Sequence, residues 1–218
     1  MNRPYLGIAE LPRELPVFPL AGCLLLPQAN LPLNIFEPRY LAMVDVALAG
    51  RRLIGMIQPL PDAVNDAKPE LCAVGCAGRI TQFAETGNGR YFITLEGVCR
   101  FRIGAEMERD TPFRVFNLDY ADFSLDLSQT EDAHAIDRDA VLSALRIYAK
   151  RNEINVDWEA IAKLSDKVLV DSLCMMSPFG IMEKQALLEA RDLRARAAAL
   201  VAIAEMDLAG SDKRPPLH

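Results

Sequence analysis

The feature that most limits the fold of this chain is an uncharged apolar run near its N-terminus. Residues 15–36, LPVFPLAGCLLLPQANLPLNIF, contain 22 positions without a charged side chain, which is long enough to cross a bilayer. Prolines at positions 16, 19, 27 and 32 interrupt the run, and each removes a backbone donor and blocks a helical turn. Because every backbone polar group needs an internal partner in lipid, we expect no membrane span. We predict two short buried strands instead, Val17–Leu20 and Leu24–Leu26.

The composition is that of an ordinary globular protein without a basic region. The chain has 218 residues, of which 51% are hydrophobic and 25% charged, so it can hold one large domain or two small ones. Residues 1–125 carry 12 Lys and Arg against 14 Asp and Glu, and residues 126–218 carry 12 against 16. Because neither half is basic, the composition argues against a nucleic-acid partner held through its phosphates.

The N-terminus and the cysteines favour a cytoplasmic location. MNRPYLGIAELPREL lacks the uninterrupted apolar segment of a secretory signal. The five cysteines are an odd number and form no C-x-x-C pair. Cys72 and Cys76, if they lie in one strand, would be about 13 Å apart, too far for a disulfide or a shared metal ion. We therefore expect reduced thiols in a cytoplasmic protein.

The first part of the chain has the pattern of a β-rich unit with one helix. Pro38 fits the first position of a helix and Gly50 the position just past its end, so we predict a helix over Pro38–Ala49. The turn residues of GNG at 87–89 indicate a hairpin. Strands are predicted at 52–58, 72–85, 91–95, 98–103 and 113–118.

From about Ser128 onward Ala, Leu and charged residues dominate, which indicates helices. Ser128 and Glu131 form a capping-box pattern, and Asp157 and Ser165 fit the N-caps of two further helices. Helices are also predicted at 182–190 and 193–206. The predicted fold class is therefore α+β, with a β-rich subdomain over 1–125, an α-helical subdomain over 126–208 and a disordered tail over 209–218.

The sequence lacks the common catalytic motifs. No Gly is followed by Lys, so there is no phosphate-binding G-x-x-x-x-G-K-[ST] loop, and neither G-x-S-x-G nor S-x-x-K occurs. The only histidines are His134 and His218, so an H-E-x-x-H zinc helix is impossible. We predict no catalytic residue, no cofactor, no metal site and no enzymatic activity. A catalyst assembled from scattered residues stays an alternative that no motif supports.

The segment FEPRY at 36–40 combines the most varied side-chain chemistry in a short stretch. A carboxylate just before a helix can accept hydrogen bonds from its free backbone donors, an arginine can reach a carboxylate or a carbonyl, and a tyrosine offers an apolar ring with a polar tip. We interpret the segment as a structural helix-entry clamp, with a ligand site as the alternative. The clamp consists of Phe36, Glu37, Pro38, Arg39 and Tyr40.

The segment LPVFPLAGCLLLPQANLPLNIFEPRYLAMV closely resembles the opening signature of the Lon substrate-binding (Lon N-terminal) domain family. That signature reads roughly L-P-h-F-P-L with h apolar, then an apolar pair and Pro, then L-P-L-x-I-F-E-P-R-Y. CAVGCAGRI, GRYFITLEGVCRFRI and LLEARDLRARAAALV look like later parts of the family, so the resemblance covers about residues 12–208. Asn34 departs from it, since many members carry His there. The resemblance implies a PUA-like β pseudobarrel followed by an α-helical bundle.

The resemblance also implies a function. Full Lon proteases continue into an ATPase module and a Ser–Lys peptidase domain, whose motifs this sequence lacks, so the chain resembles a stand-alone Lon-domain protein. In the parent protease this domain helps to select and hold protein substrates. We therefore expect a non-enzymatic module for protein quality control that binds unfolded or partner protein segments. Its candidate peptide-binding residues are Leu24, Leu25 and Leu26, if their turn lies at the surface rather than in the core.

Two other functions stay open. PUA-like barrels elsewhere bind RNA, and Arg100, Arg102 and Arg114 could form a local basic patch despite the acidic balance of the chain. A small-molecule sensor, or a cryptic enzyme, could instead use a cleft between the barrel and the bundle.

Overall fold

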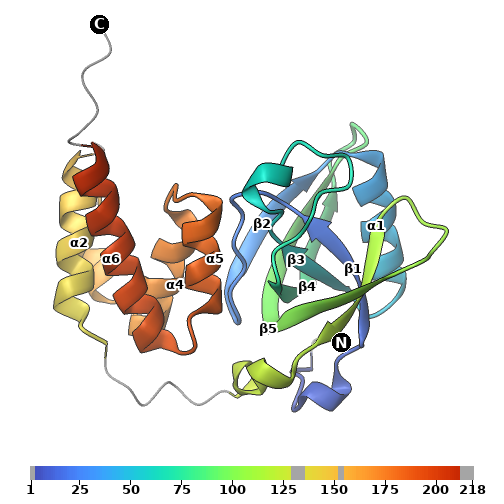
Figure 1. Ribbon diagram of the computed structural model, residues 1–218, viewed down its shortest axis with the longest axis horizontal. Coiled ribbons are helices and arrows are strands. Elements are labelled where there is room, and N and C mark those ends of the chain that lie inside the picture. The colour runs from blue at the N-terminus through green and yellow to red at the C-terminus, as the bar shows by residue number, and fades with distance from the viewer. Residues whose placement is uncertain (1–2, 129–135, 152–154, 212–218) are drawn as a thin grey trace, which may run out of the picture. The chain divides into compact units, whose positions relative to one another are not determined.

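The structure, a computed structural model, describes residues 3–128, 136–151 and 155–211. The chain divides into two compact units, one formed by residues 1–129 with 179–188 and the other by 130–178 with 189–218. Figure 1 shows strands early in the chain and helices late, as the predicted α+β class requires. Three predicted features lie outside the described residues: the Glu131 half of the capping box, His134 and the tail over 212–218.

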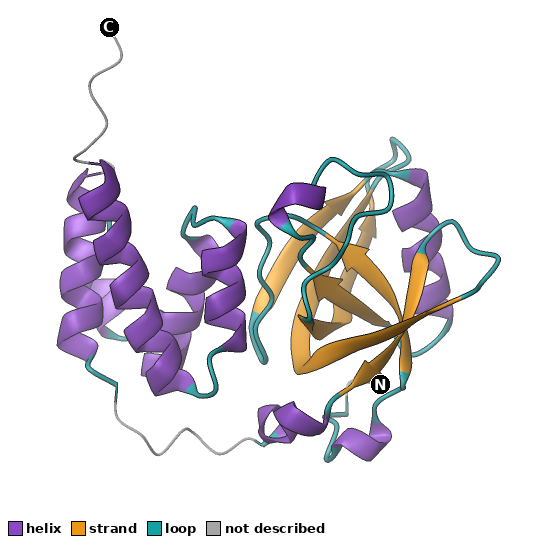
Figure 2. Cartoon of the chain, viewed as in Figure 1, coloured by secondary structure: helices purple, strands orange, loops and turns teal. Residues whose placement is uncertain are grey.

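The first unit is built on a six-stranded mixed sheet with the order β2-β5-β4-β3-β1-β6. Strand β6 pairs with β5 as well as with β1, and this extra pairing closes the sheet into a near-barrel (Figure 2). Strands β1 and β3 are parallel, and the other pairs are antiparallel. The strands are β1 Glu14–Pro19, β2 Asn30–Ile35, β3 Leu53–Ile57, β4 Val74–Glu85, β5 Tyr91–Met107 and β6 Arg114–Asp119.

The core of the near-barrel centres on Phe101, which is fully buried. A Cβ at Gly75 would lie 2.5 Å from the Phe101 ring and 2.5 Å from the Met56 carbonyl oxygen. Any side chain at position 75 would therefore displace the ring or the neighbouring strand, so the packing of β4 over Phe101 requires glycine there.

The opening apolar run forms a strand, a buried loop and a second strand. Strand β1 confirms the first predicted strand in outline, but Leu24–Leu26 is not a strand, and the second strand lies at Asn30–Ile35. Pro32 falls in β2, which pairs only with β5 among the described strands. A missing N–H is tolerated on such an edge strand. No helix in the described residues is long and apolar enough to cross a membrane.

Leu24, Leu25 and Leu26 lie in the core, so the surface position that their predicted role in peptide binding required is not found. Their exposed fractions are 2%, 2% and 0%. The loop packs tightly because two glycines face it: a Cβ at Gly78 would lie 2.7 Å from Leu25 Cδ2, and one at Gly97 would lie 2.0 Å from the Leu26 carbonyl oxygen. Apolar burial at this density stabilises the core, so these leucines belong to it.

The first unit also contains helix α1, Pro38–Ala49, with the bounds that its proline and glycine predicted. Short 3₁₀ helices lie at η1 Ile8–Glu10, η2 Pro61–Ala63 and η3 Ala121–Leu127. Helix α5, Ile181–Glu189, belongs almost entirely to this unit, whereas the predicted division grouped it with the other helices. The helix belongs to the first unit because buried polar side chains connect it to the strands and loops of that unit.

The second unit contains α2 Arg138–Arg151, α3 Trp158–Ala162, α4 Asp166–Met176 and α6 Leu193–Ser211. Both predicted N-caps are confirmed, since the side chain of Asp157 accepts from Ala160 N and that of Ser165 from Val168 N. A buried ion pair of 3.1 Å between Arg196 and Asp171 joins α6 to α4. Helix α6 ends at Ser211, so residues 209–211 are helical rather than part of the predicted tail.

Candidate functional site

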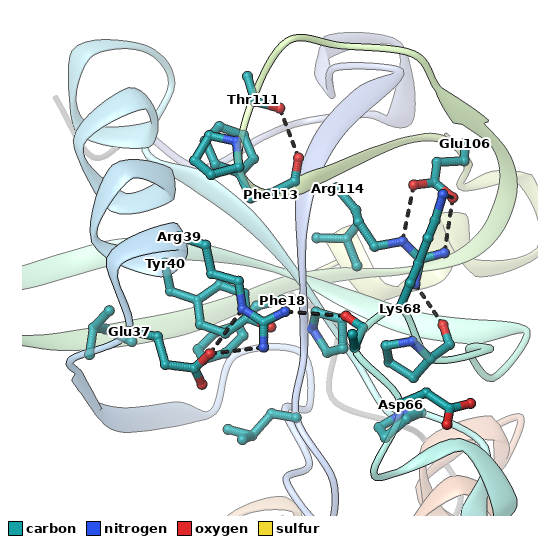
Figure 3. Close-up of a pocket in the computed structure, with 18 of the residues that line it drawn as sticks. Phe18, Glu37, Arg39, Tyr40, Asp66, Lys68, Glu106, Thr111, Phe113 and Arg114 are labelled. Atoms are coloured by element: carbon teal, nitrogen blue, oxygen red, sulfur yellow. Dashed lines mark hydrogen bonds and ion pairs between the residues drawn. The ribbon is translucent and has the colours of Figure 1, made fainter.

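The first unit contains a groove of about 1130 Å³, shown in close-up in Figure 3. Four segments that are far apart in the sequence line it. They are β1 with the residues after it (17–21), the end of β2 with the start of α1 (33–40), the loop after β3 (59–69), and the connection between β5 and β6 (106–114).

The floor of the groove is apolar and aromatic. Phe18, Tyr40 and Phe113 line it and are 6%, 6% and 7% exposed. The rings of Phe18 and Tyr40 pack with their centroids 4.2 Å apart and their planes tilted by 41°. Burial raises the pKa of the Tyr40 hydroxyl, against the opposing charge of Arg39. The floor is therefore a fixed apolar surface that stays neutral at physiological pH.

The rim carries apolar side chains that are open to solvent. Phe36 is 60% exposed and Val64 is 39% exposed, and both line the groove. Large exposed apolar groups beside a concave surface are typical of binding sites. The groove therefore offers apolar contact at two levels, its floor and its rim.

Two arginines hold the loop that forms one wall. Arg39 donates to the carbonyl oxygen of Ala67 (3.4 Å), and Arg114 donates to that of Pro69 (2.6 Å). The base of the loop is fixed by the hydrogen bond from Leu60 N to Glu70 O, 2.9 Å. These contacts connect the loop, whose one regular element in the described residues is η2, to the start of α1 and to β6.

Glu106 is the centre of an ion-pair network that connects this loop to β5 and β6 (Figure 3). It accepts two hydrogen bonds from Arg114, of 3.1 and 3.0 Å, and pairs with Lys68 at 3.1 Å. The hydrogen bonds from Arg114 lower the pKa of the Glu106 carboxyl, partly opposed by burial and supported by Lys68. A forked arginine–carboxylate pair of this kind has a fixed geometry.

The structure places four of the five clamp residues in the groove, namely Phe36, Glu37, Arg39 and Tyr40. Pro38 occupies the first turn of α1. Glu37 pairs with Arg39 (2.8 Å), with both side chains 42% exposed, but it makes no capping hydrogen bond to the helix. The predicted contact of Glu37 with the free backbone donors is therefore wrong, because its carboxylate turns to Arg39 instead.

The other sequence-predicted residues either lie in the core or are already engaged in ion pairs. Leu24, Leu25 and Leu26 are core residues. Of the arginines considered as a basic patch, Arg100 is buried against Asp126, Arg102 pairs with Asp122 at 2.6 Å, and Arg114 pairs with Glu106. Each of the three arginines is thus paired with a carboxylate, which argues against the basic patch that they could have formed.

Sequence reasoning missed the two loops that form the walls. Their composition, PDAVNDAKPE over 61–70 and EMERDTPF over 106–113, concentrates charge and proline. Charged surface loops on a rigid scaffold often carry function. The composition of these two loops could therefore have marked them as candidate parts of a site. Within the described ranges no group of three or more His, Cys, Asp or Glu could hold a metal ion.

Comparison with known proteins assigns the family. The chain matches the ATP-dependent protease La (LON) substrate-binding domain over residues 14–205. The chain belongs to this family. The Lon substrate-binding domain predicted from the apolar run and FEPRY is thereby confirmed. All four segments that line the groove lie within the matched residues.

One relative is Lon protease 2 of Myxococcus xanthus, which is 26% identical over 199 residues. The match covers 86% of this chain and 23% of that protease, so the chain spans less than a quarter of the relative's length.

Solved structures confirm the fold of the Lon substrate-binding domain. The N-terminal domain of Mycobacterium avium complex Lon protease matches with a TM-score of 0.60 and 20% identity, over 88% of this chain and 98% of that one. A Lon N-terminal domain protein from Xanthomonas campestris matches with a TM-score of 0.59 and 23% identity, over 87% and 97%. A near-barrel followed by helices is thus the architecture that all three share.

Proposed function

We propose that this protein binds segments of other proteins in the groove of its first unit, without catalysing a reaction on them. The observation that carries the proposal is the aromatic floor of Phe18, Tyr40 and Phe113 beneath an exposed apolar rim. The family is that of a substrate-binding domain, which supports a protein ligand. A role in protein quality control in the cytoplasm belongs to the same proposal.

The groove favours weak binding of a single short segment. A segment that covers about 300 Å² of apolar surface gains roughly 7.5 kcal/mol at 25 cal/mol/Å². Immobilisation costs at least about 4 kcal/mol, which leaves a Kd no tighter than the millimolar range. Such an affinity suits a domain that samples many protein segments and holds one through several contacts.

An RNA ligand has less support than a protein ligand. The three arginines that motivated it are paired with carboxylates, so they offer no cation to a phosphate without breaking an ion pair. The small-molecule alternative stays a prediction.

NMR titration tests the proposal. Isotope-labelled protein would be titrated with an unlabelled nine-residue peptide that has a central Leu-Phe-Leu, Gln and Ser at the other positions, and blocked termini. We expect the largest shift changes at residues that line the groove. Phe36→Ala should weaken binding by about three- to tenfold, because exposed aromatic anchors dominate such contacts, while the protein stays folded.

Phe83→Ala is the matched control, since Phe83 is 44% exposed on β4 and does not line the groove. It should bind the peptide like the wild type. Shift changes confined to other surfaces, or equal losses in Phe36→Ala and Phe83→Ala, would contradict the groove as the binding site.

A further inference from the structure

We propose that the groove selects protein segments that carry lysine or arginine beside an apolar anchor. This inference rests on the proposed function and names the class of segment that the same site prefers. It comes from the charges on the two walls rather than from the apolar floor.

Each cation of the groove already has a carboxylate partner. Arg39 pairs with Glu37, and Lys68 and Arg114 both pair with Glu106. Arg109 pairs at 2.6 Å with Glu14, which lies outside the lining. A bound acidic side chain would therefore have to compete with a carboxylate for each of these cations. Lys68 and Arg114, which share Glu106, carry the one positive charge that these pairs do not balance.

Three carboxylates of the groove have no such partner. Asp66, Glu108 and Asp110 line it and are exposed, and none of them forms an ion pair with another described residue. Asp66 lies on the loop after β3 (Figure 3), whereas Glu108 and Asp110 lie in the connection between β5 and β6. The lining thus contains five carboxylates against four cations, and the three unpaired carboxylates lie on two of its four segments.

This arrangement is complementary to a basic segment with an apolar centre. The anchor would occupy the aromatic floor, and Lys or Arg a few residues away would reach the free carboxylates on each wall. Exposed ion pairs are individually weak, so the effect of the charges is on the choice of segment more than on its total affinity. Because the carboxylates are exposed, salt should weaken the preference.

Three peptides would test the preference by NMR titration. All have the same central Leu-Phe-Leu and blocked termini, and the two positions on each side are Lys, Gln or Glu. At low salt we expect the Lys peptide to bind about tenfold tighter than the Gln peptide, and the Glu peptide to bind more weakly than both. Raising the salt to about 0.5 M, where the Debye length falls to roughly 4–5 Å, should bring the three affinities together.

The variants assign the preference to the named carboxylates. Glu108→Gln should weaken the Lys peptide about 1.5- to 5-fold and leave the Gln peptide unchanged. The triple variant Asp66→Asn, Glu108→Gln and Asp110→Asn should remove the preference. Glu85→Gln is the matched control, because Glu85 is an exposed carboxylate of β4 outside the groove, and it should bind all three peptides like the wild type.

The outcomes separate this inference from the proposed function. If all three peptides bind equally well at the groove, the basic preference is overturned and the proposed function stands. A preference that survives in the triple variant also overturns it, because other residues would then be responsible. If no peptide binds at the groove, both proposals fail.

Discussion

Arg100 joins three elements of the first unit through one buried charge. It forms a double hydrogen bond with Asp126, of 2.9 and 2.8 Å, and donates to the Leu188 carbonyl oxygen at 3.0 Å. Its guanidinium lies 4.8 Å from the centre of the Phe123 ring. Burial by itself lowers the pKa of Arg100, but the hydrogen bonds and the charge of Asp126 raise it by more, so Arg100 stays protonated.

Removing the partner of Arg100 should therefore be costly. The side chains of Arg100 and Asp126 are 6% and 8% exposed, and a buried charge left without its partner costs about 3–5 kcal/mol. We expect Asp126→Ala to lose about this much free energy of unfolding in urea denaturation. Asp122→Ala is the control: it breaks the exposed pair with Arg102 (57% and 54%) and should lose less than about 1 kcal/mol. Equal losses in both variants would show that burial does not decide the cost.

Breaking the Glu37–Arg39 pair, in contrast, should cost little free energy of unfolding. Because Glu37 and Arg39 are 42% exposed, we expect Arg39→Ala to change the free energy of unfolding by less than about 1 kcal/mol. The same change removes the hydrogen bond to Ala67 that holds a wall of the groove, so peptide affinity should fall by several fold. Thermal melts and NMR titration of the one variant measure the two effects. A large drop in melting temperature would return Arg39 to a purely structural role.

The pKa of Glu106 predicts that the free energy of unfolding depends on pH. Its pKa is lowered in the folded protein by Arg114, so the ionised carboxylate contributes stability above the unfolded-state pKa. This contribution is lost as the pH falls through the lower, folded-state pKa. The difference in unfolding free energy between wild type and Glu106→Gln should be constant from pH 7 to about 5 and shrink between about pH 5 and 3. Urea denaturation at stepped pH measures it, and a difference that keeps its full size at about pH 3 would contradict the assignment.

Among the elements, α5 shows how polar contacts can decide which unit a helix joins. Gln58 donates to the Ile181 carbonyl at 3.0 Å, and Gln185 donates to the Val74 carbonyl at 3.0 Å. Lys184 donates to the Gly22 carbonyl at 2.8 Å. Gln58, Lys184 and Gln185 are 1%, 6% and 5% exposed. The helix is thus held to β4 and to the loops of the first unit by buried polar side chains as well as by its leucines.

Gln185→Leu should be destabilising although it adds apolar surface. It would leave the buried Val74 carbonyl without this donor, which costs about 1–3 kcal/mol. Met182→Leu is the matched control, since Met182 lies on the same helix, is 55% exposed and should change stability by less than about 0.5 kcal/mol. Urea denaturation compares the two variants. A Gln185→Leu variant as stable as the wild type would show that the leucines alone hold α5.

The elements with strong local signals were predictable from the sequence. Helix α1 has the predicted bounds because Pro38 and Gly50 mark its ends within the chain itself. Strand β5 was predicted as two strands and is one of 17 residues, because Gly97 reads as a break. Its real role is tertiary: it lets the Leu26 carbonyl approach the strand. Leu24–Leu26, predicted as a strand, form the loop that makes this contact instead.

The candidate site was only partly predictable, for a similar reason. FEPRY supplied its best-marked residues, and four of them line the groove. The walls come from loops whose positions depend on contacts with distant residues, such as those of Arg39 with Ala67 and Arg114 with Pro69. Periodicity along the chain carries no information on such contacts, so the pairing of Glu106 and the free carboxylates could not be derived from it.

For the whole molecule, the proposed function requires that binding occurs without chemistry. Among the described residues, the groove is lined by no histidine or cysteine and by one lysine, Lys68, which pairs with Glu106. The hydroxyl of Thr111 donates to the Phe113 carbonyl. A nucleophilic hydroxyl needs a base within hydrogen-bonding reach, whereas the Thr111 hydroxyl donates to a backbone carbonyl. The sequence also lacks a Gly-Lys pair for a phosphate loop.

We therefore expect the purified 218-residue chain to leave both ATP and protein substrates intact. Unfolded casein and the Lys peptide, incubated with the protein and ATP, should keep their masses in mass spectrometry, and no phosphate should be released above the buffer control. The triple carboxylate variant is the informative control, because it should differ from the wild type in peptide binding and in nothing else. Cleavage or phosphate release that changes with variants of the groove would show that the site performs chemistry, and the binding proposal would then have to give way to an enzymatic one.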